Sequence, residues 1–244
     1  MIATSVIEAV IFDWGGTLSV LASIDLEDMW RAAARHLAPE REDEVLAVLE
    51  SVEARSWDRV RTDQMATTVG RLLSEAGDEL GLDVTAAVLE EAESHHLDAW
   101  TPHITHDPDA ALTLAGLRQR GLRTGLLSNT HWPRHFHEHF MERDGLAGLI
   151  DARLYTSEMM RTKPHREAFE AALGAVGVTT PDRAVFVGDR LYDDVFGAQS
   201  AGLRTVWRRN VGMPPYGVEP DAVIDTLPEL LQLVEGWMER PTSP

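Results

Sequence analysis

Three apolar segments of this chain each end in a polar residue, and this pattern constrains the fold more than any other feature. Val6–Phe12 is a run of β-branched and apolar residues that ends at Asp13, and similar runs end at Ser128 and Asp189. Such runs predict buried strands. Helical patterns lie between them, at Asp109–Arg120, His135–Arg143, Arg166–Val176 and Val195–Ala201. Strands that alternate with helices predict a parallel sheet of the α/β class.

One long segment interrupts this alternation. Between about Leu26 and Trp100, apolar residues recur at spacings of three and four, which predicts successive amphipathic helices and no strand. We therefore expect a helical cap at residues 25–100, inserted between the first two core strands. The core would comprise residues 1–24 and 101–244.

Composition narrows the classes of partner and compartment. Of the 244 residues, 44% are hydrophobic, enough for a substantial core, but no apolar stretch approaches the roughly 20 residues of a membrane span. The absence of cysteine and of a basic-flanked leader favours the cytoplasm. A net charge of −18 disfavours nucleic acid and anionic membranes as partners. The sequence does not indicate an oligomeric state.

The polar residues at the strand ends are candidates for chemistry. Asp13 precedes Gly15-Gly16-Thr17, so its carboxylate would project from a tight turn at the carboxyl edge of the sheet, where ligands bind in parallel sheets. Ser128 and the amide that follows it could hold a phosphate oxygen. Each residue alone is equally well interpreted as a turn or helix-capping residue.

Two further groups strengthen the case. Lys163, the only lysine beside 21 arginines, precedes Pro164 at an element boundary. Asp189, Asp193 and Asp194 place three carboxylates within six residues at the end of an apolar run. Oxygen ligands of this kind suit Mg²⁺, although acids at a helix N-terminus are the alternative interpretation.

Taken in order, these segments resemble the four motifs of the haloacid dehalogenase-like superfamily. The segments are Val-Ile-Phe-Asp-x-x-Gly-Thr-Leu, Leu-Leu-Ser-Asn, Lys-Pro and Phe-Val-Gly-Asp-x-x-x-x-Asp-Val-x-Gly-Ala. Four motifs in order are far more specific than one. The resemblance implies a Rossmann-like core, a helical cap that closes over the site, and hydrolysis of a small phosphorylated substrate.

The resemblance also assigns roles to residues. It implies that Asp13 is the nucleophile that forms an aspartyl-phosphate and that Lys163 neutralises nucleophile and phosphate. Two residues of the turn after Asp13 and two residues of the Leu-Leu-Ser-Asn segment are expected to contact the substrate. Residues of the first and fourth segments are expected to bind Mg²⁺. The expected substrate-binding residues are Ser128, Asn129, Gly16 and Thr17, and the expected metal ligands are Asp13, Gly15 (through its carbonyl), Asp189 and Asp194.

One motif position departs from the family. Phosphatases of this family carry a second aspartate two residues after the nucleophile, as general acid and base, and this chain has Gly15 there. A positioned acid or base is worth about 10²- to 10⁴-fold in rate. Two interpretations therefore remain: a hydrolase with a good leaving group or a substitute acid from the cap or from the loop near His131, and a binding module without turnover.

Two related activities fit less well. Asp-Trp-Gly-Gly-Thr is similar to a phosphonoacetaldehyde hydrolase motif, but that chemistry needs a cap lysine, and Lys163 is in the core. Haloacid dehalogenases would have a disrupted fourth motif and no metal, whereas Asp189 and Asp194 are both present.

Two other groups of residues are ambiguous. His131, His135 and His139 recur every fourth residue, and we interpret them as a polar helix face rather than a metal site. His131 alone is close enough to Ser128 to reach the pocket. Tryptophans of the cap, Trp30, Trp57 and Trp100, are either core residues or pocket walls.

Overall fold

A single parallel sheet forms the centre of the molecule. The computed structural model describes residues 7–22 and 24–239, and in this part of the chain six strands lie in the order β3-β2-β1-β4-β5-β6, with every neighbouring pair parallel. This is the predicted α/β, Rossmann-like class. The strands are β1 (Ala9–Phe12), β2 (Arg123–Ser128), β3 (Ala152–Tyr155), β4 (Ala184–Gly188), β5 (Arg204–Arg208) and β6 (Ala222–Ile224).

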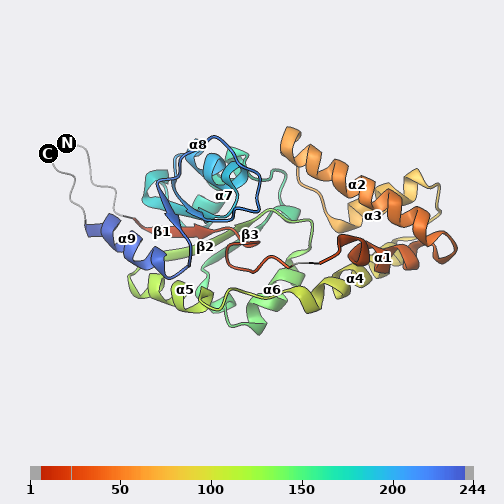
Figure 1. The fold of residues 1–244 in the computed structure, drawn as a ribbon, viewed down its shortest axis with the longest axis horizontal. Helices are drawn as coiled ribbons and strands as arrows, with labels where there is room; N and C mark the ends of the chain where they lie inside the picture. The colour runs from red at the N-terminus through yellow and green to blue at the C-terminus, as the bar shows by residue number, and fades with distance from the viewer. Residues whose placement is uncertain (1–6, 23, 240–244) are drawn as a thin grey trace.

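Helices cover both faces of the sheet because successive side chains of a strand point to opposite faces. In β1, Val10 and Phe12 pack into one apolar cluster and Ala9 and Ile11 into another. Figure 1 shows α5 and α6 on one side of the sheet and α7 and α8 on the other. The helices are α5 (Ala110–Gln119), α6 (Arg134–Arg143), α7 (Arg166–Ala175), α8 (Gly197–Ser200) and α9 (Glu229–Glu239).

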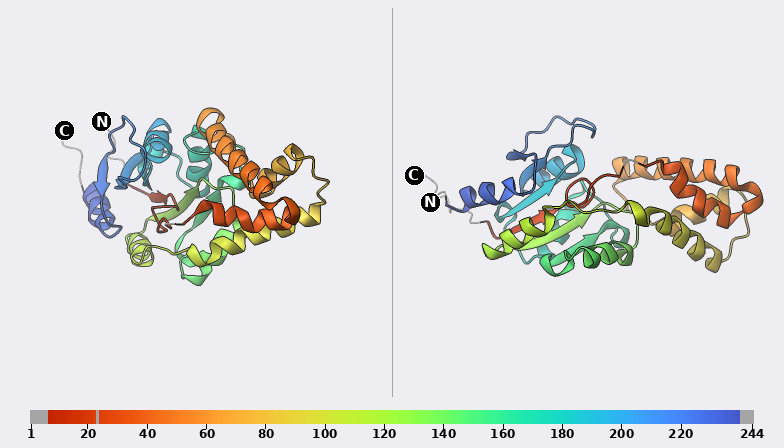
Figure 2. Two further views of the ribbon diagram at one scale, coloured as in Figure 1. Left: turned by 45° about the vertical axis from the view of Figure 1, so that its right-hand side comes forward. Right: turned by 60° about the horizontal axis from the view of Figure 1, so that its bottom comes forward.

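Four helices form a separate bundle beyond the carboxyl ends of the strands (Figures 1 and 2). They share an apolar cluster of their own, which includes Trp30, Leu49, Leu72 and Ala92. No regular strand interrupts this segment, which the structure describes completely, in line with the amphipathic spacing of its sequence. The helices are α1 (Leu26–Leu37), α2 (Glu42–Asp63), α3 (Val69–Glu79) and α4 (Ala86–Trp100).

The observed element bounds differ from the predicted ones at a few places. The first strand begins at Ala9, and Val6 lies outside the described residues. The helix expected at Val195 begins earlier, as a π-helical turn over Leu191–Phe196 that leads into α8. In the described part of the chain, no helix is long and apolar enough to cross a bilayer.

Candidate active site

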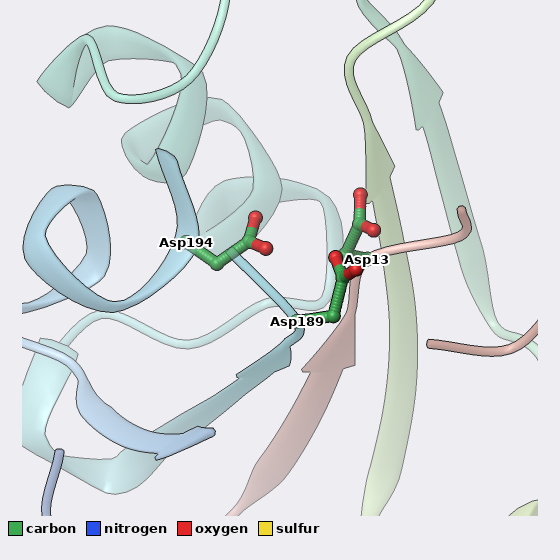
Figure 3. A group of neighbouring side chains, drawn as sticks. All are labelled: Asp13, Asp189 and Asp194. Carbon is green, nitrogen blue, oxygen red and sulfur yellow. The ribbon is translucent and has the colours of Figure 1, made fainter. Parts of the chain in front are cut away.

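Three buried carboxylates meet at the carboxyl edge of the sheet. Asp13 follows β1, Asp189 follows β4, and Asp194 lies in the π-helical turn after β4. One oxygen of each lies within 4.8 Å of the corresponding atoms of the other two. Figure 3 shows Asp13 and Asp189 at the ends of neighbouring strands, with the carboxylate of Asp194 directed toward them. β1 and β4 are paired in register, so their ends bring the first two residues together.

Lys163 is the cation of this cluster. Its Nζ donates to Asp13 Oδ1 at 2.6 Å and to Asp194 Oδ1 at 2.7 Å, and its side chain is 1% exposed. Burial alone would lower the pKa of Lys163, but the two carboxylates more than offset this and raise it above its usual value. The ammonium is therefore charged at neutral pH.

The cluster carries more negative charge than its own cation neutralises. Three ionised carboxylates and one ammonium sum to −2, and burying uncompensated charge is costly. Burial raises the pKa of Asp13 to about 6, although Lys163 lowers it in part. Burial raises the pKa of Asp189 to about 7, although Asn210 and Arg190 lower it in part. A divalent cation would balance this charge.

One buried atom points to the same conclusion. Asp189 Oδ2 accepts a hydrogen bond from Asn210 Nδ2 at 2.7 Å, whereas Asp189 Oδ1 is buried and has no hydrogen-bond partner. Buried polar atoms are rarely left unpaired. Carboxylate oxygens in this arrangement fit Mg²⁺, which takes one or two carboxylates and completes its shell with water and substrate oxygens.

Two glycines allow the carboxylates to approach. Gly16 has a φ of +80°, and a Cβ there would lie 2.3 Å from Asp189 Oδ2. A Cβ on Gly188 would lie 2.3 Å from Asp194 Cγ. A side chain at either position would displace a member of the cluster. Gly15 differs, because no atom lies within 4 Å of the position where its Cβ would be.

Asn129, in the Leu-Leu-Ser-Asn segment, binds the backbone of Lys163. Asn129 Nδ2 donates to the Lys163 carbonyl and Asn129 Oδ1 accepts from the Lys163 amide, both at 2.9 Å. Asn129 thus holds the lysine in place. Ser128 is buried at the end of β2, and the hydroxyl of Thr17 is buried without a hydrogen-bond partner.

A pocket of about 400 Å³ opens beside this cluster. Gly15, Ser128, Asn129 and Arg190 line it from the core. The helical bundle contributes aromatic side chains and one acid to the same pocket: Trp30, Trp57, Trp100, His96 and Glu53. The three tryptophans that were ambiguous in sequence are therefore pocket walls, and Trp30 also belongs to the bundle core.

The histidines do not form a metal site. His131 is buried, precedes α6, and stacks on Trp57 with ring centroids 4.3 Å apart, whereas His135 and His139 are exposed. The prediction that His131 shares a polar helix face with His135 and His139 is therefore wrong. Burial lowers the pKa of His131 to about 4, so this pocket residue is neutral at pH 7. Among the described residues, the aspartate cluster is the one group that fits a metal ion.

Several residues of the site carry no signal in the sequence. Asn210 and Trp207 both bond to Asp189, the indole through the main-chain carbonyl at 2.9 Å. Arg190 and Glu53 reach the pocket from different elements. The two bonds to Asp189 depend on the pairing of β4 with β5, which no local pattern predicts.

Comparison with known proteins agrees with this geometry. A family model described as haloacid dehalogenase-like hydrolase matches residues 7–202. Glyceraldehyde 3-phosphate phosphatase of Pyrococcus furiosus is 33% identical over 143 residues, which cover 52% of this chain and 54% of that protein. Phosphoserine phosphatase of Thermus thermophilus is 36% identical over 125 residues, 50% of this chain and 49% of that one. The chain thus spans about half the length of these curated relatives.

Solved structures share the fold along most of the chain. A HAD phosphatase from Thermococcus onnurineus matches with a TM-score of 0.66 and 25% identity, over 94% of this chain and 99% of that one. A 2-haloacid dehalogenase from Pseudomonas syringae matches with a TM-score of 0.69 and 24% identity, over 95% and 99%. The second likeness concerns the fold alone.

Proposed function

Because the chain belongs to the haloacid dehalogenase-like hydrolase family, we propose that it is a Mg²⁺-dependent phosphohydrolase of a small phosphorylated substrate. The contact of Lys163 with both Asp13 and Asp194 carries the proposal, since it joins one ammonium and two carboxylates in a buried cluster that could supply a nucleophile and metal ligands. Phosphatase relatives support the phosphate ester as substrate. We further propose that α1–α4 act as a cap, with residues 25–100 as one domain.

Each residue of the cluster has a role in this reaction. An oxygen of Asp13 attacks phosphorus, the bond from phosphorus to the leaving oxygen breaks, and an aspartyl-phosphate forms. Water then attacks that phosphorus, which releases phosphate and restores the Asp13 carboxylate. Lys163 offsets the charge of the nucleophile and of the transferred group throughout. When bound by Asp13, Asp189, Asp194 and the Gly15 carbonyl, Mg²⁺ would supply charge stabilisation to the phosphoryl oxygens.

The substrate contacts follow from the same edge of the sheet. Ser128 lines the pocket next to the cluster, and its hydroxyl would hold a phosphoryl oxygen. The buried Thr17 hydroxyl belongs to the turn after Asp13, has no hydrogen-bond partner and would bind the same group. The Gly16 amide instead donates to the Ser19 carbonyl at 3.0 Å, and Gly16 serves the site through its close approach to Asp189. Asn129 would act by positioning Lys163.

The proton donor is the missing part. Gly15 lines the pocket where the family has an aspartate, so the leaving oxygen receives no proton from this position. His131 is neutral at pH 7 because of its low pKa, which makes it a poor acid. Without a donor at this position, an alkyl phosphate would still bind but would react more slowly than an ester whose oxygen leaves as a stable anion.

A phosphate-release assay tests the proposal. The chain should release phosphate from p-nitrophenyl phosphate in Mg²⁺, and chelation by EDTA or Asp13→Asn should remove this activity. The absence of turnover with intact binding of Mg²⁺ and beryllofluoride would favour the binding module, which the glycine at position 15 also supports. Release of halide from 2-chloropropionate without Mg²⁺ would point to a dehalogenase instead.

A further inference from the structure

The pocket beside the carboxylate cluster has two chemically different ends. The end next to the sheet is lined by Gly15, Ser128 and Arg190. The end formed by α1, α2 and α4 is lined by Trp30 and by other aromatic side chains of the bundle. A substrate with its phosphate at the cluster must therefore place its organic part against indole rings.

Glu53 is the one acidic side chain among the residues that line this pocket. Its Oε2 accepts a hydrogen bond from Trp30 Nε1 at 2.6 Å. Across the described ranges 7–22 and 24–239, no arginine, lysine or histidine forms an ion pair with it. Burial raises the pKa of Glu53, while the indole N–H groups of Trp30 and Trp57 favour its ionised form. A carboxylate therefore faces an aromatic pocket without a counter-ion.

The two histidines that stack on Trp30 and Trp57 do not supply the missing positive charge. His96 stacks on Trp30 with ring centroids 4.0 Å apart, and His131 stacks on Trp57. Burial lowers the pKa of each histidine to about 4, so both are neutral at pH 7. Arg190 pairs with Asp193 at 3.6 Å and lies after β4, in the core beside the carboxylate cluster.

We propose that this pocket takes a phosphate monoester whose organic part ends in a compact alkyl ammonium group, held between the indole rings and Glu53. The proposal rests on the proposed function, because the phosphate end must occupy the cluster. Indole faces attract cations through their negative electrostatic potential, and a desolvated carboxylate adds a direct charge pair. The substrate would thus be zwitterionic, with its charges matched to the two ends of the pocket.

Other organic groups fit the pocket less well. A neutral apolar group would displace water from Glu53 and leave its charge uncompensated. A second anionic group would be repelled by the same carboxylate. The charge of the far group should therefore control affinity more than its shape does.

A pair of ligands of equal shape tests this directly. Phosphocholine and 3,3-dimethylbutyl phosphate differ only in the positive charge of the terminal group. Titration in Mg²⁺ would follow the fluorescence of the pocket tryptophans in the parent protein, in Glu53→Gln and in Glu50→Gln. Glu50 is exposed on the same helix, so its variant makes the same charge change outside the pocket.

The parent protein and Glu50→Gln should bind phosphocholine about 10-fold or more tightly than its uncharged isostere. Glu53→Gln should weaken the binding of phosphocholine alone and bring the ratio close to one. Equal affinities in the parent, or an unchanged ratio in Glu53→Gln, would overturn the proposal.

Turnover separates this inference from the proposed function. If p-nitrophenyl phosphate is hydrolysed but the ammonium group gives no advantage, the ligand class is wrong and the phosphohydrolase stands. If no phosphate ester is hydrolysed but the affinity ratio and its loss in Glu53→Gln are observed, the ligand class stands and the activity is wrong.

Discussion

At the scale of single residues, the site depends on charge balance within a buried cluster. Burial is the main cause of the raised pKa values of Asp13 and Asp189, and the neighbouring aspartates raise them further, so changing one member of the cluster alters the others. Gly16 and Gly188 are part of this balance, because a Cβ at either position would meet an aspartate. Substitutions in the cluster should therefore affect metal and phosphate binding differently.

Asp189→Asn should abolish Mg²⁺ binding measured by calorimetry. The amide keeps the shape of the side chain but removes the charge next to the unpaired Oδ1 atom. Asp193→Asn is the matched control, since Asp193 lies nearby, pairs with Arg190, and is outside the cluster. Equal Mg²⁺ affinity in Asp189→Asn and the parent would rule out the site.

Lys163→Met should affect the binding of Mg²⁺ and the binding of beryllofluoride differently. Removal of the ammonium takes the cluster from −2 to −3, so Mg²⁺ should bind at least as tightly while beryllofluoride binding is lost. Turnover should fall by about 10²-fold or more, the size expected when an electrostatic stabiliser is lost. The exposed Arg166→Met should change neither property. Unchanged beryllofluoride affinity in Lys163→Met would contradict the role of the lysine.

At the scale of elements, the sequence predicts what local patterns encode. The continuous apolar run of β1, which is buried at every position, and the amphipathic spacing over α1–α4 are local patterns, so the sheet class and the helical insert could be predicted. β3, β5 and β6 could not be predicted, because they contain half-buried or exposed positions, as in Arg204–Arg208. β3 and β6 are the two edge strands, and β5 carries an arginine at each end, so the sequences of all three show less apolar continuity.

The residues of the site, like the elements of the fold, could be predicted only where a local sequence pattern marks them. Asp13, Ser128, Lys163 and Asp189 follow recognisable motifs, and the carboxyl ends of parallel strands bring such residues together. Glu53 is on α2 and belongs to the far wall of the pocket, where only the packing of the bundle determines its neighbours. Positions of this kind need the tertiary structure.

A buried histidine on α6 makes stability depend on pH. His137 stacks on Tyr155 with centroids 4.5 Å apart, and burial lowers its pKa to about 3. The unfolded chain takes up a proton below about pH 6.5 and the folded chain does not. This contribution to stability is thus complete above that pH and decreases as pH falls.

His137→Phe should remove this dependence while preserving the ring contact. Between about pH 6 and 4, the free energy of unfolding of the parent should decrease by about 1.4 kcal/mol per pH unit more than that of the variant. Urea titrations at several pH values would measure both slopes. Parallel slopes would show that His137 takes up its proton in the folded state.

At the scale of the whole molecule, metal binding should stabilise the protein in a pH-dependent way. The folded-state pKa values of about 6 and 7 for Asp13 and Asp189 lie above their ordinary value of 3.8. In the metal-free protein their contribution to stability is present below about pH 4 and is lost as pH rises through 6 to 7. Mg²⁺ competes with these protons, so its affinity should increase over that range.

Thermal unfolding with and without Mg²⁺ would check this expectation. The increase in Tm caused by Mg²⁺ should be larger at pH 8 than at pH 5, and Asp189→Asn should show little increase at either pH. An equal increase at both pH values in the parent would place the bound metal elsewhere.

We propose a phosphohydrolase that has its catalytic groups except the proton donor to the leaving oxygen. Gly15→Asp is the decisive variant, because Gly15 lines the pocket and no atom lies within 4 Å of the position where its Cβ would be. The ratio of kcat/KM for an alkyl phosphate to that for p-nitrophenyl phosphate should be measured in Mg²⁺ for parent and variant. We expect this ratio to increase by about 10²-fold or more, because only the alkyl oxygen needs a proton to leave. An unchanged ratio, or no turnover by either protein while Mg²⁺ and beryllofluoride still bind, would contradict it.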